Sequence, residues 1–580
     1  MLTQSHQHRD LTHLLELRAM ESPEKPMYSF LDRHLNCSSS YRYGEFFEKT
    51  REFAVQLQRA GLARTPVLLL QPDAEEFVLS FWACILAGAW PMPYVRPHGY
   101  RWSHLDALLK QSGASAVLTS ASIAKLIPVQ TLDDIKLITL CTLSSATDCA
   151  STRWIRPHTD KEDVAFIQYT SGSTSSPRGV VITHGNILNN LEAIHRDFAC
   201  TKQDIGLGWL PLHHDMGLVG HVLQPCFSGI HNYFMRAADF PGNPLSWLVA
   251  IHRYRATISG GPCFAYALCT QPRALNALER SGFDIAALDL SCWRLAFCGS
   301  QKVIPQVLTA FSRQFSNMGF DDNAWFPCYG LAESTLYVGG IQGIHTTRIA
   351  NQQEPFAGVA RVDGGNADIK IVDPVTGLVC VDGKKGEIWI SSASVSPGYY
   401  RHSIQSKRHF DHAIKGRGAY FRTGDLGFIR DGVLYFSGRE KNLIKLRGRS
   451  VHGEDIETIV HHEVCDLDIS QCVVVPHCVE HDETFSLLVE WAGRKQCFAT
   501  SGAPDIDVRI RNLICDTFSV VPHRIFFLDR GSLPMTTSGK PARSACWALL
   551  QHYLDNEPQS AGDLVKRQRL HQLTGASAHA

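Results

Sequence analysis

The sequence predicts an α/β protein with a large N-terminal domain, built from layered α/β subdomains plus a β-rich subdomain, and a small C-terminal α+β domain. Three observations predict it. Over the first 440 residues, apolar strand-like runs alternate with amphipathic stretches, which is typical of parallel strands covered by helices. From residue 386 the strand-like runs come closer together. After Leu443 a shorter unit begins, in which helices and strands again alternate.

The N-terminal elements follow from apolar runs. PVLLL at 66–70 is expected to be a buried strand, and Asp73 is the expected N-cap of the helix that follows. The apolar run 77–90 contains Ser80 and Gly88 and spans 14 residues. A membrane span needs roughly 20 residues, so a buried helix is the better interpretation. Further strands are expected at 116–120, 136–140 and 163–170, with parallel pairing in the α/β layers.

The C-terminal elements are shorter and begin with strands at 386–390 and 434–438 in the β-rich subdomain. The small domain is expected to contain helices at 453–463 and near 505–518, and strands at 472–476, 485–491 and 524–529. The expected domains are residues 1–441, residues 442–556 and a loose tail at 557–580.

Composition excludes several classes of function. Lys+Arg and Asp+Glu both number 56, so the chain has no overall basic charge with which to bind nucleic acid. The N-terminus lacks the apolar core of a signal peptide. We therefore expect a cytoplasmic protein without stable membrane insertion. The 18 cysteines are irregularly spaced and include no C-x-x-C pair, which favours reduced thiols.

The stretch YTSGSTSSPRGVVITHGN at 169–186 is the first candidate for chemistry. Glycine lets the backbone approach an anion closely, and consecutive N–H groups form a nest for it. The hydroxyl residues add donors, and Arg178 adds a permanent cation. A Walker A sequence is absent from the chain. The stretch alone is compatible with a phosphate loop or with a flexible Ser/Gly turn, and a helix is expected to begin near His184.

Five further segments follow in order: WLPLHHDMGLVG (209–220), FPCYGLAEST (326–335), YFRTGDLG (420–427), GREKNLIKLRG (438–448) and LPMTTSGK (533–540). Together with the 169–186 loop they resemble the motifs of adenylate-forming enzymes, which comprise acyl-CoA synthetases, luciferases and adenylation domains. The resemblance extends over roughly residues 10 to 550. Within the family, segments 209–220, 259–269 and 288–300 look most like those of fatty-acyl-AMP ligases.

The resemblance implies the reaction. A fatty-acyl-AMP ligase activates a medium- or long-chain fatty acid with ATP and Mg²⁺, releases pyrophosphate, and passes the acyl group to the phosphopantetheine thiol of an acyl carrier protein. No carrier domain is evident in the chain, so the carrier is expected to be a separate protein. Two anions meet in such a reaction, so cations and hydrogen-bond donors must offset their charge. The small domain is expected to be mobile, as in the family.

The resemblance also implies the site residues. The expected nucleotide-binding residues are Thr170, Ser171, Gly172, Ser173, Thr174, Arg178, Gly299, Ser300, Tyr329, Gly330, Asp425 and Arg439. Of these, Tyr329 would stack on adenine and Asp425 would accept the ribose hydroxyls, as an acceptor-only carboxylate can. Glu333 and Thr174 would bind Mg²⁺, which prefers oxygen ligands. Lys540 would bridge the α-phosphate and the attacking carboxylate, and His214 would lie beside that carboxylate.

The expected acyl-binding residues are His213, Met216, Gly217, Leu218 and Gly261. Ordinary structural roles remain possible for several candidates from the residues alone. Met216 and Leu218 could belong to a packed helix face, Tyr329 could be a core tyrosine, and Lys540 a solvated lysine.

Three departures from the family pattern stand out. Asn442 occupies the hinge position that usually carries aspartate. Ser300 and the two residues after it replace the usual Ala-Glu-Pro, and Arg178 replaces lysine. The insertion that disfavours coenzyme A in fatty-acyl-AMP ligases could lie in 336–357 or 401–419. An acyl-CoA synthetase and a non-catalytic nucleotide- or acyl-binding relative therefore remain as alternatives.

Overall fold

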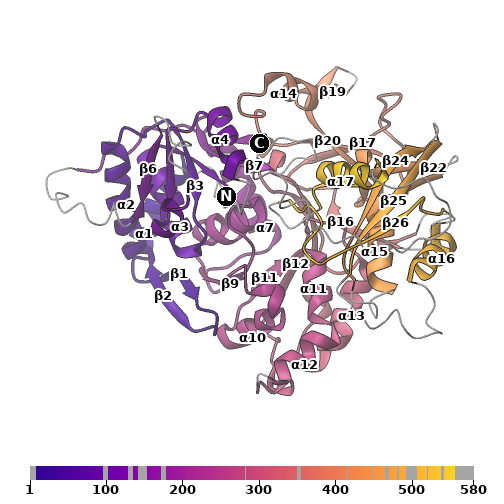
Figure 1. Ribbon diagram of the computed structural model, residues 1–580. Helices are drawn as coiled ribbons and strands as arrows, with labels where there is room; N and C mark the ends of the chain where they lie inside the picture. Colours follow the sequence, from indigo (N-terminus) through magenta and orange to yellow (C-terminus); the bar gives the residue numbers. More distant parts are fainter. Residues whose placement is uncertain are drawn as a thin grey trace. The chain divides into compact units, whose positions relative to one another are not determined.

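The computed structural model describes residues 8–95, 102–127, 135–140, 153–170, 178–280, 282–348, 355–414, 416–446, 449–463, 469–479, 482–491, 506–518, 520–536 and 541–555. The chain divides into two compact units (Figure 1). The larger unit contains residues 1–170, 178–423 and 427–436, and the smaller unit contains the rest. The predicted domain boundary at 441/442 and the tail at 557–580 stay predictions.

A four-stranded parallel sheet forms the N-terminal part of the larger unit, as predicted. Its order is β4-β3-β5-β6, with β3 (Pro66–Leu70) parallel to β4 (Trp90–Pro93) and β5 (Ala116–Thr119), and β6 (Lys136–Thr139) parallel to β5. The predicted helix is α3 (Ala74–Ala87), and the Asp73 carboxylate caps it by accepting the N–H groups of Glu75 and Glu76. α3 is buried from Phe77 to Ala87. In Figure 1 it lies beside α2 (Tyr43–Arg59).

One predicted pairing is wrong. The strand expected at 163–170 is β7 (Val164–Thr170), but it pairs antiparallel with β8 (Arg178–Thr183) instead of joining a parallel layer. Only residues 171–177 separate the two strands. A parallel connection needs a dozen or more residues, so this short loop permits only a hairpin. The helix expected near His184 is confirmed as α7 (His184–Asp197), and Thr183 and Asn186 cap it reciprocally.

An eight-stranded sheet runs through the larger unit in the order β14-β13-β12-β11-β9-β10-β1-β2. Its six central strands are parallel, and β14 and β2 pair antiparallel at the edges. The central strands β11 and β12 are fully buried, which is typical of a parallel sheet covered on both faces, whereas the edge strand β2 is polar and mostly exposed. The strands are β1 (Pro26–Leu31), β2 (Cys37–Arg42), β9 (Ile205–Gly208), β10 (His231–Phe234), β11 (Ile258–Gly261), β12 (Leu295–Cys298), β13 (Trp325–Gly330) and β14 (Tyr337–Gly340).

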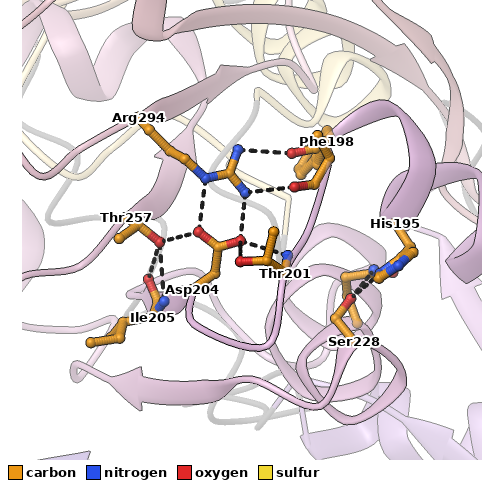
Figure 2. Close-up of polar contacts among 10 residues, drawn as sticks. His195, Phe198, Thr201, Asp204, Ile205, Ser228, Thr257 and Arg294 are labelled. Carbon is orange, nitrogen blue, oxygen red and sulfur yellow. Dashed lines mark hydrogen bonds and ion pairs between the residues drawn. The ribbon is translucent and has the colours of Figure 1, made fainter.

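An ion pair between the buried carboxylate of Asp204 and the partly exposed guanidinium of Arg294 joins the amino ends of three strands of this sheet. Asp204 precedes β9, Thr257 precedes β11 and Arg294 precedes β12. Arg294 donates to both carboxylate oxygens of Asp204 at 2.8 and 2.6 Å, and Thr257 donates to the carboxylate at 2.7 Å. Figure 2 shows the same guanidinium facing the carbonyl of Phe198, the C-cap of α7. The pair therefore fixes the sheet and α7 together at the amino edge.

The β-rich part of the larger unit is a seven-stranded sheet ordered β15-β16-β21-β20-β18-β17, with β19 paired to β20. The predicted strands at 386–390 and 434–438 are β18 and β21. The strands are β15 (Thr346–Thr347), β16 (Phe356–Arg361), β17 (Asp368–Val372), β18 (Gly386–Ser391), β19 (His412–Ile414), β20 (Arg417–Arg430) and β21 (Val433–Arg439).

The smaller unit is α+β, as predicted. β22 (Leu443–Leu446) and β23 (Arg449–His452) form a hairpin, and β25 (Asp482–Trp491) pairs antiparallel with β24 (Ile469–Val479) and parallel with β26 (Ile525–Leu528). Its helices are α15 (Gly453–Glu463), α16 (Ile506–Phe518) and α17 (Arg543–Asp555). Buried aliphatic residues of α15 and α16 pack in one core with the inward side chains of β24 and β25.

The larger unit contains further helices besides α2, α3 and α7. None of the helices in the described ranges combines the length and the apolarity needed to cross a membrane. The further helices of the larger unit are α1 (Leu11–Glu21), α4 (Trp102–Ser112), α5 (Ala121–Ala124), α8 (Asp215–Gly217), α9 (Gln224–Ser228), α10 (Leu245–Tyr254), α11 (Cys263–Cys269), α12 (Pro272–Arg280), α13 (Pro305–Phe315) and α14 (Ser403–His409), with a π-helical turn at Leu218–Leu223.

Candidate active site

Most predicted site residues of the larger unit lie at one edge of the eight-stranded sheet. β9, β11, β12 and β13 are parallel neighbours, so the segments after them meet at their carboxyl ends. Ligands of α/β proteins commonly bind outside the carboxyl ends of such strands. The predicted residues at or just beyond these ends are His213, His214, Gly261, Gly299, Ser300, Tyr329, Gly330 and Glu333. The ion pair of Asp204 lies at the opposite ends of the same strands.

The carboxyl end of β13 has no room for a side chain at Gly330. A Cβ atom there would lie 1.9 Å from the carbonyl oxygen of Leu336. Gly299 is similarly confined, because a Cβ atom would lie 2.8 Å from the sulfur of Cys328. Both glycines are therefore required by packing within the chain, whether or not a nucleotide approaches them.

Tyr329 and Ser300 flank these glycines. Tyr329 is buried, and its ring stacks on Phe436 with centroids 6.0 Å apart. Ser300 is exposed and has a φ of 66°, a left-handed conformation that is uncommon without glycine. Lys302, which stands where the family pattern has proline, places its ammonium 5.1 Å from the ring centroid of Phe356. Adenine stacking by Tyr329 stays a prediction.

Glu333 has the donor chemistry for a divalent cation. Its carboxylate is half-buried, and Oε1 accepts a hydrogen bond from the hydroxyl of Tyr399 at 2.8 Å. Within the ranges that the structure describes, no lysine, arginine or histidine forms an ion pair with Glu333. A partly buried carboxylate in this environment fits Mg²⁺, which prefers oxygen ligands. The second predicted ligand, Thr174, lies outside the described residues.

The backbone around Glu333 is held in a strained turn. Thr335 has φ 67° and ψ −57°, and the N–H of Leu336 donates to the carbonyl of Ser334 at 2.8 Å. This is a γ-turn with positive φ, the rarer and strained form. The buried Asn190 of α7 holds the turn, since its amide donates to the carbonyls of Ser334 and Tyr337 at 3.2 and 2.8 Å.

The histidine segment follows β9. His213 and His214 are half-buried with ring centroids 4.3 Å apart, and the carbonyl of His213 accepts from the Gln168 side chain of β7 at 2.8 Å. A Cβ atom at Gly217 would lie 2.3 Å from the carbonyl oxygen of Pro211. Leu218 is fully buried and begins the π-helical turn, a feature found frequently at functional sites. Met216 is partly buried against the core, as a packed helix face would be.

The ends of the predicted phosphate loop are described, but its centre is not. Thr170 and Arg178 are opposite each other in the β7–β8 hairpin, and the Arg178 guanidinium lies 5.5 Å from the ring centroid of Tyr399. Ser171, Gly172, Ser173 and Thr174 lie outside the described residues, as does Lys540. Their roles stay predictions.

In the smaller unit, the structure brings Asp425 and Arg439 together. Asp425 is buried, and Arg439 Nε lies 3.0 Å from its Oδ1, while the arginine side chain is half-exposed. Two of the predicted nucleotide-binding residues thus form an ion pair within the smaller unit.

The hinge candidate Asn442 also has a defined partner in the smaller unit. Its amide donates to the carboxylate of Glu454 at the start of α15. Arg543 lies 3.5 Å from Glu454 and pairs with both oxygens of Glu457 at 2.9 Å. Arg543 is the first residue of α17, three positions after Lys540. The amide of Asn442 can therefore donate to the neighbouring carboxylate of Glu454, whereas an aspartate at this position would place a second carboxylate against it.

Sequence reasoning missed partners of the predicted residues in each unit. In the larger unit, Tyr399 and Asn190 contact residues that are 66 and 144 positions away. In the smaller unit, Glu454 contacts Asn442, and Arg543 contacts Glu457 from 86 positions away. No spacing or composition marks such contacts, because they arise only when the strands and helices of each unit pack together. The partial signal was the Asn442 departure, which indicates a changed hinge environment.

Comparisons with known proteins place the chain in a family. The AMP-binding enzyme family profile matches residues 15–400. The chain is 32% identical over 565 residues to the medium-chain-fatty-acid–[acyl-carrier-protein] ligase JamA of Moorena producens, covering 92% of this chain and 94% of that protein. It is 29% identical over 580 residues to a putative fatty-acid–CoA ligase, fadD21, of Mycobacterium leprae, covering 93% and 97%. A solved structure from work on fatty acyl-adenylate ligases of E. coli and L. pneumophila matches with TM-score 0.82 at 28% identity, covering 94% and 98%.

Proposed function

The chain belongs to the AMP-binding enzyme family and is an ATP-dependent ligase, and from that premise we propose that it is a fatty-acyl-AMP ligase that serves an acyl carrier protein. It activates a medium- or long-chain fatty acid to the acyl-adenylate with release of pyrophosphate. It then transfers the acyl group to the phosphopantetheine thiol of a separate carrier protein. The observation that carries the proposal is that Glu333, Ser300 and the His213–His214 segment follow neighbouring parallel strands at the carboxyl edge of the eight-stranded sheet. The chain is also similar to JamA along its length.

The first step joins two anions. A carboxylate oxygen of the fatty acid attacks the α-phosphorus of ATP, and the bond from that phosphorus to the bridging oxygen of pyrophosphate breaks. We assign Thr170, Ser171, Gly172, Ser173, Thr174 and Arg178 to the leaving phosphates. When bound at Glu333 and Thr174, Mg²⁺ supplies charge neutralisation to the phosphates. Lys540 stabilises the transition state by contacting both the α-phosphate and the attacking carboxylate.

The remaining predicted residues bind and orient the reactants. Asp425 and Arg439, already paired with each other at 3.0 Å, hold the ribose, and Tyr329 with Gly330, Gly299 and Ser300 borders the adenine. His214 holds the fatty-acid carboxylate, and His213, Met216, Gly217, Leu218 and Gly261 border the start of the acyl chain. A long apolar chain gains about 0.8 kcal/mol for each CH₂ that it buries.

In the second step, the thiolate of the carrier attacks the acyl carbon, and AMP leaves with the electron pair of the broken C–O bond. The thiol proton passes to solvent. The similarity to JamA supports the carrier as acceptor, and the similarity to a putative fatty-acid–CoA ligase supports coenzyme A as the second candidate. Both candidates share the adenylation step and differ only in the thiol.

The test measures acyl-AMP and pyrophosphate with ATP, Mg²⁺ and a series of saturated fatty acids of increasing length. The protein should form acyl-AMP with at least one acid. Lys540→Ala serves as the control in which the adenylation step is impaired. Addition of a phosphopantetheinylated carrier should then give acyl-carrier in large excess over the acyl-CoA formed with coenzyme A. Abundant acyl-CoA would make the chain an acyl-CoA synthetase. Nucleotide binding without pyrophosphate from any acid would make it a non-catalytic relative.

A further inference from the structure

We propose that Tyr399 is a positioning residue for Glu333: its hydroxyl sets the orientation of the carboxylate toward a divalent cation, and Arg178 in turn holds the tyrosine ring. The inference rests on the proposed function, because it uses the cation-binding role that we assign to Glu333. It adds to that function a residue that no motif contains.

The backbone of Glu333 is already immobilised on two sides. The Ser396 N–H donates to the carbonyl of Glu333 at 2.8 Å, and the next residues form the strained turn held by Asn190. The buried Thr335 hydroxyl donates to the carbonyl of Ser394 at 2.7 Å. With the backbone fixed in this way, the side-chain torsions of Glu333 are the freedom that remains. A single hydrogen bond to Oε1 can therefore decide where the carboxylate points.

Tyr399 is itself held rigidly. It forms a β-bridge with Val180 of β8, and its own N–H donates to the Ser406 hydroxyl at 2.9 Å. The ring is buried, and the ring of Phe410 packs edge-on against it at 5.3 Å. The hydroxyl is therefore presented to Glu333 from a fixed support on the β-rich side of the unit.

The hydroxyl orients Glu333 without neutralising it. A phenol hydroxyl, with an ordinary pKa of about 10, is a neutral donor at physiological pH. It uses one acceptor position of the carboxylate and leaves the others for a cation. A lysine in its place would compete with that cation for the same charge.

Arg178 contacts the same tyrosine. Its guanidinium lies 5.5 Å from the Tyr399 ring centroid, within the range of a cation–π contact. Tyr399 thus contacts both the metal-ligand candidate and the first residue of β8. We expect the arginine to affect cation binding about twofold to fivefold through this contact, which is the strength of an exposed cation–π pair.

The experiment measures Mn²⁺, a paramagnetic substitute for Mg²⁺, bound to the full chain with a non-hydrolysable ATP analogue. Water proton relaxation reports the ternary complex and needs no turnover. Tyr399→Phe should weaken Mn²⁺ binding about tenfold, since hydrogen bonds to charged groups are worth at least that factor. The matched control is Tyr420→Phe, which removes another tyrosine hydroxyl that donates to a carboxylate, that of Asp368. The control should bind Mn²⁺ as the unaltered protein does.

A double-mutant cycle keeps the test independent of general destabilisation. In a Glu333→Gln background, Tyr399→Phe should have no further effect on Mn²⁺ affinity, because the carboxylate that it orients is gone. Effects of Tyr399→Phe that persist undiminished in the Glu333→Gln protein would overturn the inference, since they would reveal a structural role.

The inference and the proposed function can fail separately. Equal Mn²⁺ affinity in the Tyr399→Phe, Tyr420→Phe and unaltered proteins would overturn the positioning role, even if pyrophosphate release is normal. Absence of pyrophosphate release with every acid would overturn the proposed function. In that case the Mn²⁺ titration would still decide what Tyr399 does for Glu333. A tenfold loss confined to Tyr399→Phe would support the inference.

Discussion

Removal of the Asp204 carboxylate tests how the sheet is held beneath the site. Asp204 accepts five hydrogen bonds: two from Arg294, one from Thr257, and the N–H and hydroxyl of Thr201 at 2.8 and 3.1 Å. Breaking a buried pair by removing one partner costs about 3–5 kcal/mol. The Arg294 side chain is 36% exposed and keeps its bond to Phe198, so water can partly solvate it. We therefore expect the lower end, about 3 kcal/mol, for Asp204→Ala.

The assay is urea denaturation followed by tryptophan fluorescence, with Asp106→Ala as the matched control. Asp106 pairs with Lys110 on an exposed helix face, where such pairs contribute about 0.3–0.5 kcal/mol. A loss of less than about 1 kcal/mol in the free energy of unfolding of Asp204→Ala would refute the reasoning, because exposed surface ion pairs contribute no more than that.

The pH dependence of the same pair has a defined sign. Burial alone would raise the pKa of Asp204, but hydrogen bonds from Arg294, Thr257 and the Thr201 backbone outweigh it, and the pKa is lowered. A carboxylate with a lowered folded-state pKa stabilises the fold above its unfolded value, near 3.9, and that contribution disappears as pH falls through the folded value. The stability difference between Asp204→Ala and the unaltered protein should therefore be constant near neutrality and shrink below about pH 4.

Three further predictions concern the site. Lys540→Ala should lower kcat by orders of magnitude with little change in nucleotide affinity, because the lysine makes its contact mainly in the transition state. Single-turnover acyl-AMP formation measures the rate and ATP titration measures the affinity. A variant that is impaired only in ATP affinity would contradict the assignment. Asn442→Asp should place a second carboxylate against Glu454 and destabilise the smaller unit by about 1 kcal/mol; this is measured by hydrogen exchange in α15, and unchanged protection would contradict it. Gly330→Ala should lose at least about 2 kcal/mol of stability through its clash with the Leu336 carbonyl, whereas a well-folded variant with only weakened ATP binding would show that the backbone yields there.

Elements with a local cause could be predicted from the sequence. The Asp73 cap depends on residues within one turn of each other, and the burial of α3 follows from one continuous apolar run; the structure confirms both. The same holds for α7, whose cap pairs Thr183 with Asn186. The prediction of a parallel pairing for β7 is wrong because it extends the α/β alternation to this strand, although the seven-residue connection to β8 permits only a hairpin.

The candidate site divides in the same way. Glu333 and Asp425 could be identified because they lie in compact motifs whose residues follow one another in the chain. Tyr399 contacts Glu333 from 66 positions away, and Asn190 reaches Ser334 across 144. Such partners are set by the packing of separate strands, and no local pattern encodes them. The strained conformation of Thr335 is likewise a consequence of this packing, since threonine has no preference for positive φ.

The most direct test of the central claim follows the oxygen of the fatty acid. A carboxylate labelled with ¹⁸O on both oxygens is incubated with the protein, ATP, Mg²⁺ and a phosphopantetheinylated carrier, and the nucleotide product is analysed by mass spectrometry. Attack by the carboxylate on the α-phosphorus predicts AMP that carries one ¹⁸O atom, together with unlabelled pyrophosphate. Formation of ADP, or of AMP without the label, would contradict the account.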